Sequence, residues 1–405
     1  MKWLILSIIS LLAINISAVT NINACATLST ANERYVLQND IAADGKCFII
    51  SANGITLDLN GKTVTFDNAP PVNAANRGFE LGTAGSASNW DQSSAPASQR
   101  TNAFPAAKGS WAPAEIQSYV MKFAAPSAEQ YVYSDPITVD PNQYYVLSAL
   151  IQRPLGYKAQ VVAQVMNGAQ IVCTVHDNSW SDLLQWSADT CVFKPTSTSI
   201  RVRLGVTGSL GGNDAYFDGI EVKTANYNID NDPSTYAQVN KYGVQLVGRS
   251  NVRITNGKIT QGQGGTYYAR GVQVSGGSTI EIDNLEIRLN APDSQALTFR
   301  VVSGTNIHND AIYMMGRRTQ YSHNGGVAAM GFRAGTGHRI YSNSIEYAPH
   351  GMYLDWSVTD FQIYNNKITI DSNAIHSYGI SIAGYAIGSS PAPSNFKIFG
   401  NNITT

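Results

Sequence analysis

The sequence is poor in charge. Only 14% of its 405 residues are Asp, Glu, Lys or Arg, and the formal net charge is −1. Nucleic acids and anionic membrane surfaces attract strongly basic proteins, so we expect neither as a partner. The chain also carries 35 glycines and 21 tyrosines. Low charge with this composition fits an extracellular all-β protein that is long enough for two substantial cores.

Cysteines are few as well. There are four, and they fall into two local pairs, Cys25 with Cys47 and Cys173 with Cys191. In an oxidising compartment, two local disulfides are the simplest of the three possible pairings. The alternative is four buried free thiols, which is less expected outside the cytoplasm.

One short apolar run stands at the start of the chain. Met1-Lys-Trp leads into the run from Leu4 to Ile16, which ends in the small residues Ser17 and Ala18. This pattern predicts a secretory signal peptide over residues 1–18, and the run is too short for a stable membrane span. Lipid attachment at Cys25 is an alternative that its flanking residues match poorly. We therefore predict a secreted protein, extracellular or at the cell surface, without a membrane span.

Residues 243–405 repeat one pattern six times. Each copy opens on a small residue, at 243, 271, 296, 326, 351 and 379, so the spacings are 28, 25, 30, 25 and 28 residues. Each copy then closes on a frame of the form Ile-x-Asn-x-x-Ile. A period of this size, built from short apolar runs and polar turns, indicates a solenoid. The third position of the frame is occupied in order by Asn256, Asn284, Asn309, Ser342, Asn365 and Gly400.

Strand chemistry indicates which solenoid this is. Apolar and polar residues alternate within each copy, as in Val272 and Val274 with Gln273 between them, which is typical of a strand with one buried face. Two or three such strands per copy predict a parallel β-helix whose coils lie about 4.8 Å apart. We expect the recurring Asn side chains to stack as a hydrogen-bonded ladder. The alternative is that they mark ordinary turns.

Residues 25–66 show the same alternation. The segment from Ile55 to Val64, together with Cys25 and Cys47, resembles the N-terminal coils of the pectin-lyase-like superfamily of right-handed parallel β-helices. The resemblance covers residues 25–66 and 226–405. It implies this fold, with residues 19–72 as an N-terminal cap and first coils, and with the segment before Tyr35 covering the open sheet edge. It implies no single function, because the fold hosts lyases, hydrolases, epimerases and non-enzymatic surface proteins.

The repeat is interrupted between residues 73 and 225. Short alternating strands, such as residues 144–150 and 161–165, predict an antiparallel β-sandwich inserted as a separate domain. Asn76-Arg-Gly-Phe-Glu80, Trp90-Asp91 and Tyr216-Phe-Asp218-Gly-Ile220 resemble the jelly-roll carbohydrate-binding modules with a galactose-binding-like fold. In such modules the opening Glu and closing Asp commonly hold a structural Ca²⁺, and carboxylates suit calcium. The resemblance thus implies calcium at Glu80 and Asp218. Otherwise both are surface charges.

A carbohydrate-binding module needs exposed aromatic rings to stack on sugars. Trp90 is expected in the core, where large aromatic residues usually lie, and Trp186 is either a core residue or part of the binding surface. The candidates for sugar binding are Trp111, Tyr157, Trp180 and Trp186, with Asp177 and Asn178 beside them.

Outward residues of the first strand of each copy are expected to stack in columns. This alignment places His350, Tyr353, Asp355 and Arg300 on one face, with Arg300 and Asp355 two coils, about 10 Å, apart. Met330 occupies the same column, and Arg333 and the pair His338-Arg339 add basic character nearby. An acid, a histidine, an arginine and aromatic rings are the groups that acid–base chemistry on a polysaccharide needs.

These groups do not form a complete catalytic pattern. A hydrolase needs two carboxyl groups about 5–10 Å apart, and we find no column of paired Asp residues as in polygalacturonases. A dense acidic Ca²⁺ site as in pectate lyases is also missing. Two functions stay open: a secreted glycan-interacting β-helix, as an enzyme a lyase more readily than a hydrolase, or a non-catalytic adhesive scaffold that binds carbohydrate through its insert. The sequence stops within the pattern, so either further coils follow or a partner covers Ile398 and Ile403.

Overall fold

The computed structural model describes residues 18–70, 72, 75–104, 118–154, 156–157, 159–176, 186–225, 241–291, 294–314, 328–348, 350–370, 378–383 and 393–404. In these ranges the chain forms strands, turns and bends and no helix, which confirms the all-β class. None of the described segments is therefore a helix long and apolar enough to cross a lipid bilayer. The predicted signal peptide, residues 1–18, lies outside the described residues except for Ala18.

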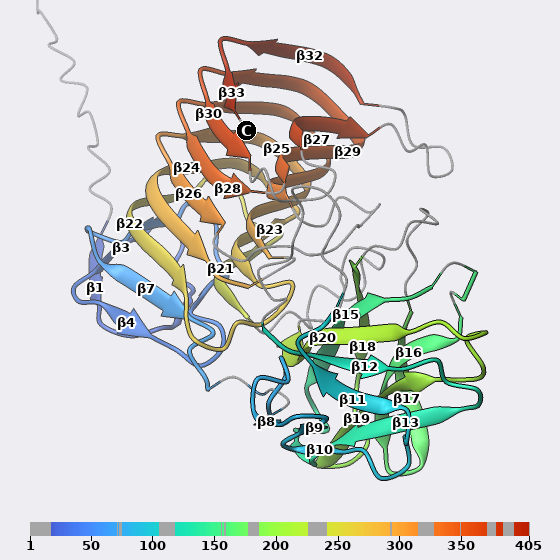
Figure 1. The fold of residues 1–405 in the computed structure, drawn as a ribbon. Helices are drawn as coiled ribbons and strands as arrows, with labels where there is room; N and C mark the ends of the chain where they lie inside the picture. The colour runs from blue at the N-terminus through green and yellow to red at the C-terminus, as the bar shows by residue number, and fades with distance from the viewer. Residues whose placement is uncertain are drawn as a thin grey trace, which may run out of the picture.

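A 20-stranded parallel sheet forms the larger part of the molecule (Figure 1). In it, each strand pairs in parallel with the equivalent strand of the next copy, so Val244 faces Val272 and Val272 faces Leu297. The strands are β1 (Val19–Ile22), β2 (Thr27–Leu28), β3 (Arg34–Leu37), β4 (Ile41–Ala42), β5 (Phe48–Ile50), β6 (Thr56–Asp58), β7 (Thr63–Phe66), β21 (Tyr242–Val247), β22 (Val252–Gln261), β23 (Arg270–Ser275), β24 (Ser278–Leu289), β25 (Gln295–His308), β26 (Ala311–Met314), β27 (Ala328–Tyr341), β28 (Ser344–Ala348), β29 (His350–Tyr364), β30 (Lys367–Ile370), β31 (Tyr378–Ala383), β32 (Ser394–Phe399) and β33 (Asn402–Thr404).

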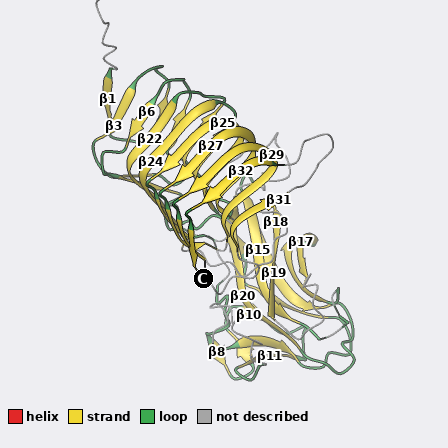
Figure 2. Ribbon diagram, turned by 90° about the horizontal axis from the view of Figure 1, so that it is seen from above, coloured by secondary structure: helices red, strands yellow, loops and turns green. Residues whose placement is uncertain are grey.

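The chain leaves this sheet after β7 and returns to it at β21. The strands on either side of the departure are neighbours, because β5 pairs with β21 and β7 pairs with β22. At the N-terminal end of the parallel sheet, β1 pairs with β3 and covers the edge of β3. Figure 2 shows the parallel strands stacked in one direction, with the antiparallel strands to one side.

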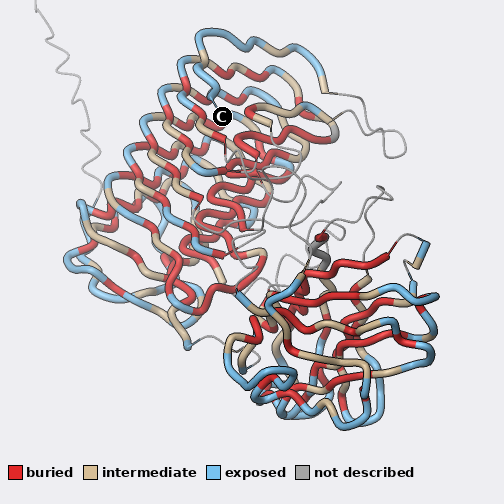
Figure 3. The backbone as a smooth tube through the Cα atoms, in the orientation of Figure 1, coloured by how far each residue is buried: buried red, intermediate tan, exposed pale blue. Residues whose placement is uncertain are grey.

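Stacked apolar side chains fill the interior of the parallel sheet. The rings of Phe299 and Phe332 lie parallel with their centroids 4.8 Å apart, and the ring of Phe361 packs edge-to-face on Phe332 with a centroid distance of 4.9 Å. All three side chains are buried, and Figure 3 shows buried residues recurring along the stacked strands. Each Å² of apolar surface that is removed from water contributes about 25 cal/mol to stability. Because this burial recurs in successive copies of the repeat, it stabilises this register.

That stack corrects the predicted alignment of the fourth copy. The structure pairs Leu297 with Met330, rather than with Val327, and Arg300 with Arg333. The opening of the copy is therefore residue 329, three residues later than predicted. The sequence around Val327 alternates weakly and fits either register, whereas the aromatic stack of Phe299 on Phe332 fits only one. Arg333, rather than Met330, consequently stands beside Arg300.

The predicted Asn ladder was wrong in its residues. Asn256, Asn284, Asn309 and Asn365 are exposed and have φ angles of 61°, 54°, 59° and 56°, so they are turn residues in the left-handed conformation that Asn tolerates. An inward ladder does exist one residue later in the chain. It consists of Asp310, Asn343, Asn366 and Asn401.

Two antiparallel sheets between β7 and β21 enclose a second core. One has the order β10-β13-β19-β16-β17 with β14 beside β19, and the other has the order β11-β12-β20-β15-β18. Trp90 lies in this core, as predicted, and is 5% exposed. Its ring centroid is 5.2 Å from that of Phe79. The strands are β8 (Gly82–Thr83), β9 (Ser86–Ala87), β10 (Trp90–Asp91), β11 (Ser98–Thr101), β12 (Val120–Phe123), β13 (Gln130–Ser134), β14 (Ile137–Thr138), β15 (Tyr144–Gln152), β16 (Val161–Asn167), β17 (Gln170–His176), β18 (Trp186–Phe193), β19 (Ser199–Val206) and β20 (Ala215–Ala225).

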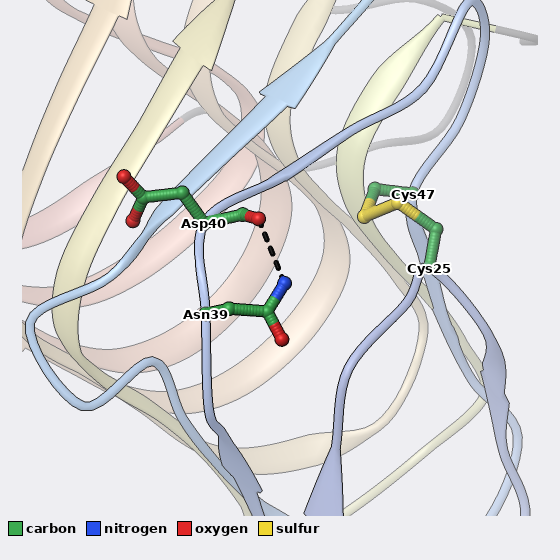
Figure 4. The surroundings of a disulfide bond; sticks show 4 residues. All are labelled: Cys25, Asn39, Asp40 and Cys47. Carbon is green, nitrogen blue, oxygen red and sulfur yellow. Dashed lines mark hydrogen bonds between the residues drawn. A yellow bond between two sulfur atoms is a disulfide. The ribbon is translucent and has the colours of Figure 1, made fainter.

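Both predicted disulfides are confirmed. Cys173 and Cys191 join β17 to β18, which are the end strands of the two antiparallel sheets. Cys25 and Cys47 join the segment before β2 to the start of β5, as Figure 4 shows beside Asn39 and Asp40. Two disulfides are consistent with the predicted extracellular location.

The antiparallel sheets contact the parallel sheet at one corner. Ala225, at the end of β20, forms a parallel bridge with Tyr267. The Tyr267 hydroxyl donates to Glu221 Oε2 at 3.0 Å, and the hydroxyls of Thr224 and Thr266 lie 2.6 Å apart. This contact brings the start of β23 next to the outer face of the five-stranded sheet.

Candidate functional site

The first strands of successive copies carry three columns of polar residues on their outward face. These columns lie on β23, β25, β27, β29 and β31, opposite the apolar residues that fill the interior. In chain order they are Arg270, Gln295, Ala328, His350 and Tyr378; then Gln273, Thr298, Gly331, Tyr353 and Ser381; then Ser275, Arg300, Arg333, Asp355 and Ala383.

The structure brings the four predicted catalytic residues to this one face. Arg300, Arg333 and Asp355 follow one another on adjacent strands, which are about 4.8 Å apart. Arg333 Nε lies 3.7 Å from Asp355 Oδ2. The prediction of Arg300 and Asp355 two copies apart therefore holds, and the corrected register adds Arg333 between them. Two adjacent guanidinium groups are a stronger anion-binding feature than the single arginine the sequence alignment placed here.

Gly331 leaves a gap in the middle column. A cavity of about 10 Å³ lies over it, which is room for about one water molecule. A Cβ atom at this position would stand 3.0 Å from Gln295 Nε2, and Thr298 Oγ1 donates to Gln295 Oε1 at 2.7 Å. The cavity is lined by Gln295, Thr298, Phe299, Arg300, Gly331, Phe332, Arg333 and Tyr353.

His350 lies on the same face as this gap without lining it. Its ring stacks on that of Tyr378, with centroids 4.0 Å apart and planes 12° from parallel. His350 and Tyr353 are neighbours on β29, in adjacent columns. Tyr353 thus stands in the column next to the arginines, and His350 lies one column further along β29 on the same face.

This polar face is buried, which the sequence did not predict. Arg300 and His350 are each 2% exposed, Asp355 4% and Tyr353 5%. Gln273 Nε2 and Ser275 Oγ are buried on the same face without a hydrogen-bond partner. Burying polar groups costs free energy unless they are bonded. A solvated solenoid surface, the simpler interpretation of the sequence, therefore does not describe this face.

Backbone strain accompanies both arginines. Val301 follows Arg300 with φ 53°, and Ala334 follows Arg333 with φ 55°. The left-handed conformation costs a residue with a side chain roughly 1–2 kcal/mol, and such strain concentrates at functional sites. Each arginine therefore immediately precedes a left-handed residue within its strand.

A second polar row crosses the outer face of the five-stranded antiparallel sheet. The register aligns Trp186 with Gln152, Gln152 with Tyr216, and Tyr216 with Lys122. Trp186 is 1% exposed, but it packs with Phe104 and Tyr216 outside the main core. Gln152 Oε1 is buried without a hydrogen-bond partner. An aromatic pair flanking an unsatisfied amide is suited to a hydroxyl-rich ligand.

Asp214 keeps Lys122, at the end of this row, positively charged. Its hydrogen bond to Lys122, at 2.7 Å, raises the pKa of the ammonium group, and burial raises the pKa of the Tyr216 phenol. At neutral pH the row thus presents a charged Lys122 and a neutral Tyr216.

The other predicted sugar-binding residues do not join this row. Trp111, Trp180 and Asp177 lie outside the described residues. Tyr157 packs half-buried against the core of the antiparallel sheets, with its hydroxyl in the space beside Gly211.

Oxygen atoms at the predicted calcium site are engaged in hydrogen bonds within the protein. Arg100 donates to the carbonyl oxygens of Phe79, at 2.5 Å, and Glu80, at 2.8 Å, and Glu80 Oε1 accepts the Tyr119 N–H. Asp218 is fully buried, with Oδ1 accepting the Gly219 N–H. In the described ranges no three acidic, His or Cys side chains gather. The Arg100 guanidinium already occupies the carbonyl oxygens of Phe79 and Glu80. Calcium at Glu80 and Asp218 stays a prediction.

Comparisons with known proteins give distant likenesses only. No protein-family model and no curated protein matches the chain. Among solved structures, a cyclase from Fischerella sp. TAU in complex with 4-(1H-indol-3-yl)butan-2-one is 15% identical over 38% of this chain and 98% of that one, with a TM-score of 0.31.

Two further likenesses are to carbohydrate-related proteins. The module TmCBM61, in complex with β-1,4-galactotriose, is 17% identical over 38% of this chain and 98% of its own, with a TM-score of 0.27. An arabinose-bound α-L-arabinofuranosidase, MgGH51, is 14% identical over 54% of this chain and 33% of its own, with a TM-score of 0.32. At these identities and scores we base no functional conclusion on them.

Proposed function

We propose that this protein is a secreted right-handed parallel β-helix with an inserted jelly-roll module, and that its arginine face, where Arg333 is partly exposed, binds a carboxylate-bearing polysaccharide. The observation that carries the proposal is the adjacency of Arg300 and Arg333 beside the gap over Gly331. Planar guanidinium groups bind carboxylates through two parallel hydrogen bonds. Parallel pairing from copy to copy supports the coil, and the resemblance of residues 25–66 supports its hand.

The groups around the arginines suit one reaction, β-elimination of a uronate polymer. A base takes the proton beside the sugar carboxylate, the C–O bond on the neighbouring carbon breaks, and a double bond forms. Arg300 and Arg333 would stabilise the charge that develops on the carboxylate. Tyr353 stands beside them as the candidate acid for the leaving oxygen, and His350, one column further along the same face, is the candidate base. Their place on the arginine face favours a lyase over a hydrolase.

Replacing Arg333 by methionine is expected to weaken binding of a polygalacturonate roughly 10- to 100-fold, because a charge-assisted hydrogen bond is lost. Arg300→Met is expected to act in the same way, and calorimetric titration measures both. The matched control is Arg339→Met, which removes an exposed arginine from the same strand, β27. Equal binding by the Arg333 and Arg339 variants would contradict the proposal. Unsaturated product formed by the wild type and lost in His350→Ala would establish the lyase.

The row on the antiparallel sheet favours the second candidate, a non-catalytic scaffold. If the insert binds the glycan, Gln152→Leu and Tyr216→Leu are expected to weaken binding of neutral oligosaccharides about tenfold, through a lost hydrogen bond and a lost stacking surface. Tyr133→Leu, on β13 of the other antiparallel sheet, is the control. Binding that survives Arg300→Met and Arg333→Met but falls in these variants would assign the function to the insert. Unchanged binding in Gln152→Leu and Tyr216→Leu would exclude this row.

A further inference from the structure

The inward ladder of the parallel sheet has a regular set of contacts. Asn343 Nδ2 donates to the carbonyl of Ile307 at 3.1 Å and to Asn366 Oδ1 at 3.0 Å. Asn366 Nδ2 repeats this pattern with the carbonyl of Ile340 at 3.0 Å and with Asn401 Oδ1 at 2.9 Å. Each side-chain amide thus donates to a carbonyl of the preceding copy, three residues before the ladder residue of that copy.

Asp310 occupies the first position of this ladder. Its N–H donates to Asn343 Oδ1 at 3.0 Å, and its Oδ1 accepts the Leu285 N–H at 2.8 Å. Oδ2 is buried without a hydrogen-bond partner among the described residues, and Asp310 is 2% exposed. By the repeat, Oδ2 stands where the asparagines carry Nδ2, which directs it to the carbonyl of Ile282. If Asp310 were a carboxylate, its Oδ2 and the carbonyl oxygen of Ile282 would be two hydrogen-bond acceptors facing each other without a proton between them.

We propose that Asp310 carries a proton in the folded protein and donates it from Oδ2 to the carbonyl of Ile282, so that a neutral carboxyl group completes the amide ladder. In this form Asp310 makes the same bond to the preceding copy as Asn343 and Asn366, with one donated hydrogen where each amide donates two. The parallel sheet then binds one proton at this position that the unfolded chain releases near neutral pH.

The charges facing Asp310 agree with this assignment. On β24, the carboxylate of Asp283 repels a second negative charge, and its own partners are Arg253 and Thr255 on β22. Arg253 Nε and one terminal nitrogen are both engaged with Asp283. His308, two residues before Asp310, lies 3.4 Å from Glu281. Burial, with a contribution from Asp283, raises the pKa of Asp310 well above its ordinary value of 3.8.

The proton makes stability depend on pH with a definite sign. The folded pKa lies above the unfolded one, so between the two values the folded state binds more protons. Stability is fully present below about pH 4 and falls as pH rises through the folded pKa. Asparagine at this position needs no proton and removes the dependence.

Asp310→Asn is expected to raise the unfolding midpoint at pH 7–8 by several degrees, and the gain is expected to shrink towards pH 4. The control is Asp360→Asn, because exposed Asp360 accepts from Thr336 and Asn395 and its pKa is lowered by the Thr336 hydrogen bond. Its substitution should produce no such gain. A midpoint of Asp310→Asn equal to or below that of the wild type at pH 7–8 would overturn the proposal.

A second measurement uses the wild-type protein and is independent of how the variant folds. In infrared difference spectra against Asp310→Asn, or against the wild type at high pH, the carbonyl stretch of a protonated carboxyl group is expected at pH 7. Only carboxylate bands at pH 7 would overturn the proposal, whatever the unfolding midpoints show.

Discussion

Alanine at position 67 is expected to destabilise the protein by about 3–5 kcal/mol, the usual cost of removing one partner from a buried charged network. Asp67 is fully buried. Its Oδ2 accepts from Gln261 Nε2 at 2.9 Å and from the Thr266 N–H at 2.8 Å, and its Oδ1 accepts from the Thr266 hydroxyl at 2.7 Å. Lys241 Nζ lies 3.4 Å away. The substitution leaves the buried Thr266 N–H without this acceptor and removes one acceptor each from Gln261 Nε2 and the Thr266 hydroxyl.

The position of Asp67 gives the loss a second consequence. It directly follows β7, where the chain leaves the parallel sheet, and Lys241 directly precedes β21, where the chain returns. Thr266 also bonds to Thr224 at the end of β20. We therefore expect residues 241–267 to exchange amide hydrogens faster in Asp67→Ala, alongside the lower free energy of unfolding in denaturant. The control is Asp40→Ala, because Asp40 is exposed and its Oδ1 accepts the Thr63 N–H at 2.8 Å. Equal losses in the two variants would contradict the role of Asp67.

Acidification from pH 6.5 towards pH 4 is expected to cost the parallel sheet about 3 kcal/mol through His338 alone. His338 is fully buried, its Nδ1 lies 2.8 Å from Thr305 Oγ1, and its ring packs 4.7 Å from that of Phe361. Burial lowers its pKa from 6.5 to about 4. Because the folded pKa lies below the unfolded one, this stability is present above pH 6.5 and is lost as pH falls to about 4.

His338→Leu separates this effect from other titrations. Leucine keeps the side chain apolar and cannot bind a proton, so the stability of the variant should change less between pH 6.5 and 4, measured by denaturant unfolding at each pH. His308→Asn is the matched control, since His308 is partly exposed and lies beside Glu281. A wild-type pH dependence that persists in His338→Leu and disappears in His308→Asn would contradict the account. The effect is opposite in sign to that of Asp310, so the two variants shift the pH of maximum stability in opposite directions.

Much of the fold is visible in the sequence because it repeats. The alternation around Val272 predicted the strands, and local cysteine pairs predicted both disulfides, which the structure confirms. Registers were less predictable where the repeat is weak. Around Val327 small apolar residues fit two alignments, and only the packing of Phe332 on Phe299 decides between them. The predicted ladder was displaced by one residue for a related reason. The recurring Asn marks the left-handed turn, whereas the next residue in the chain points inward.

The candidate site was predictable in its residues but not in its environment. Tyr353, Asp355 and Arg300 follow from the two-residue period of a strand and His350 from the alignment of the copies. That period separates the two faces of a sheet without saying whether the outer one is solvated, and here it is buried. Asp67 and Asp310 carried no local signal at all. Their partners, such as Thr266 and Leu285, come from other copies of the repeat and become visible only when the register is known.

The most direct test of the proposed function compares one polysaccharide in two forms. Wild-type protein is titrated calorimetrically with a polygalacturonate and with the same polymer after its carboxylates have been reduced to alcohols. The arginine face predicts binding to the first form, weakening as salt screens the charges, and at least tenfold weaker binding to the second. Equal affinity for both forms would contradict carboxylate recognition by Arg300 and Arg333 and would move the glycan site to the row of Gln152 and Tyr216.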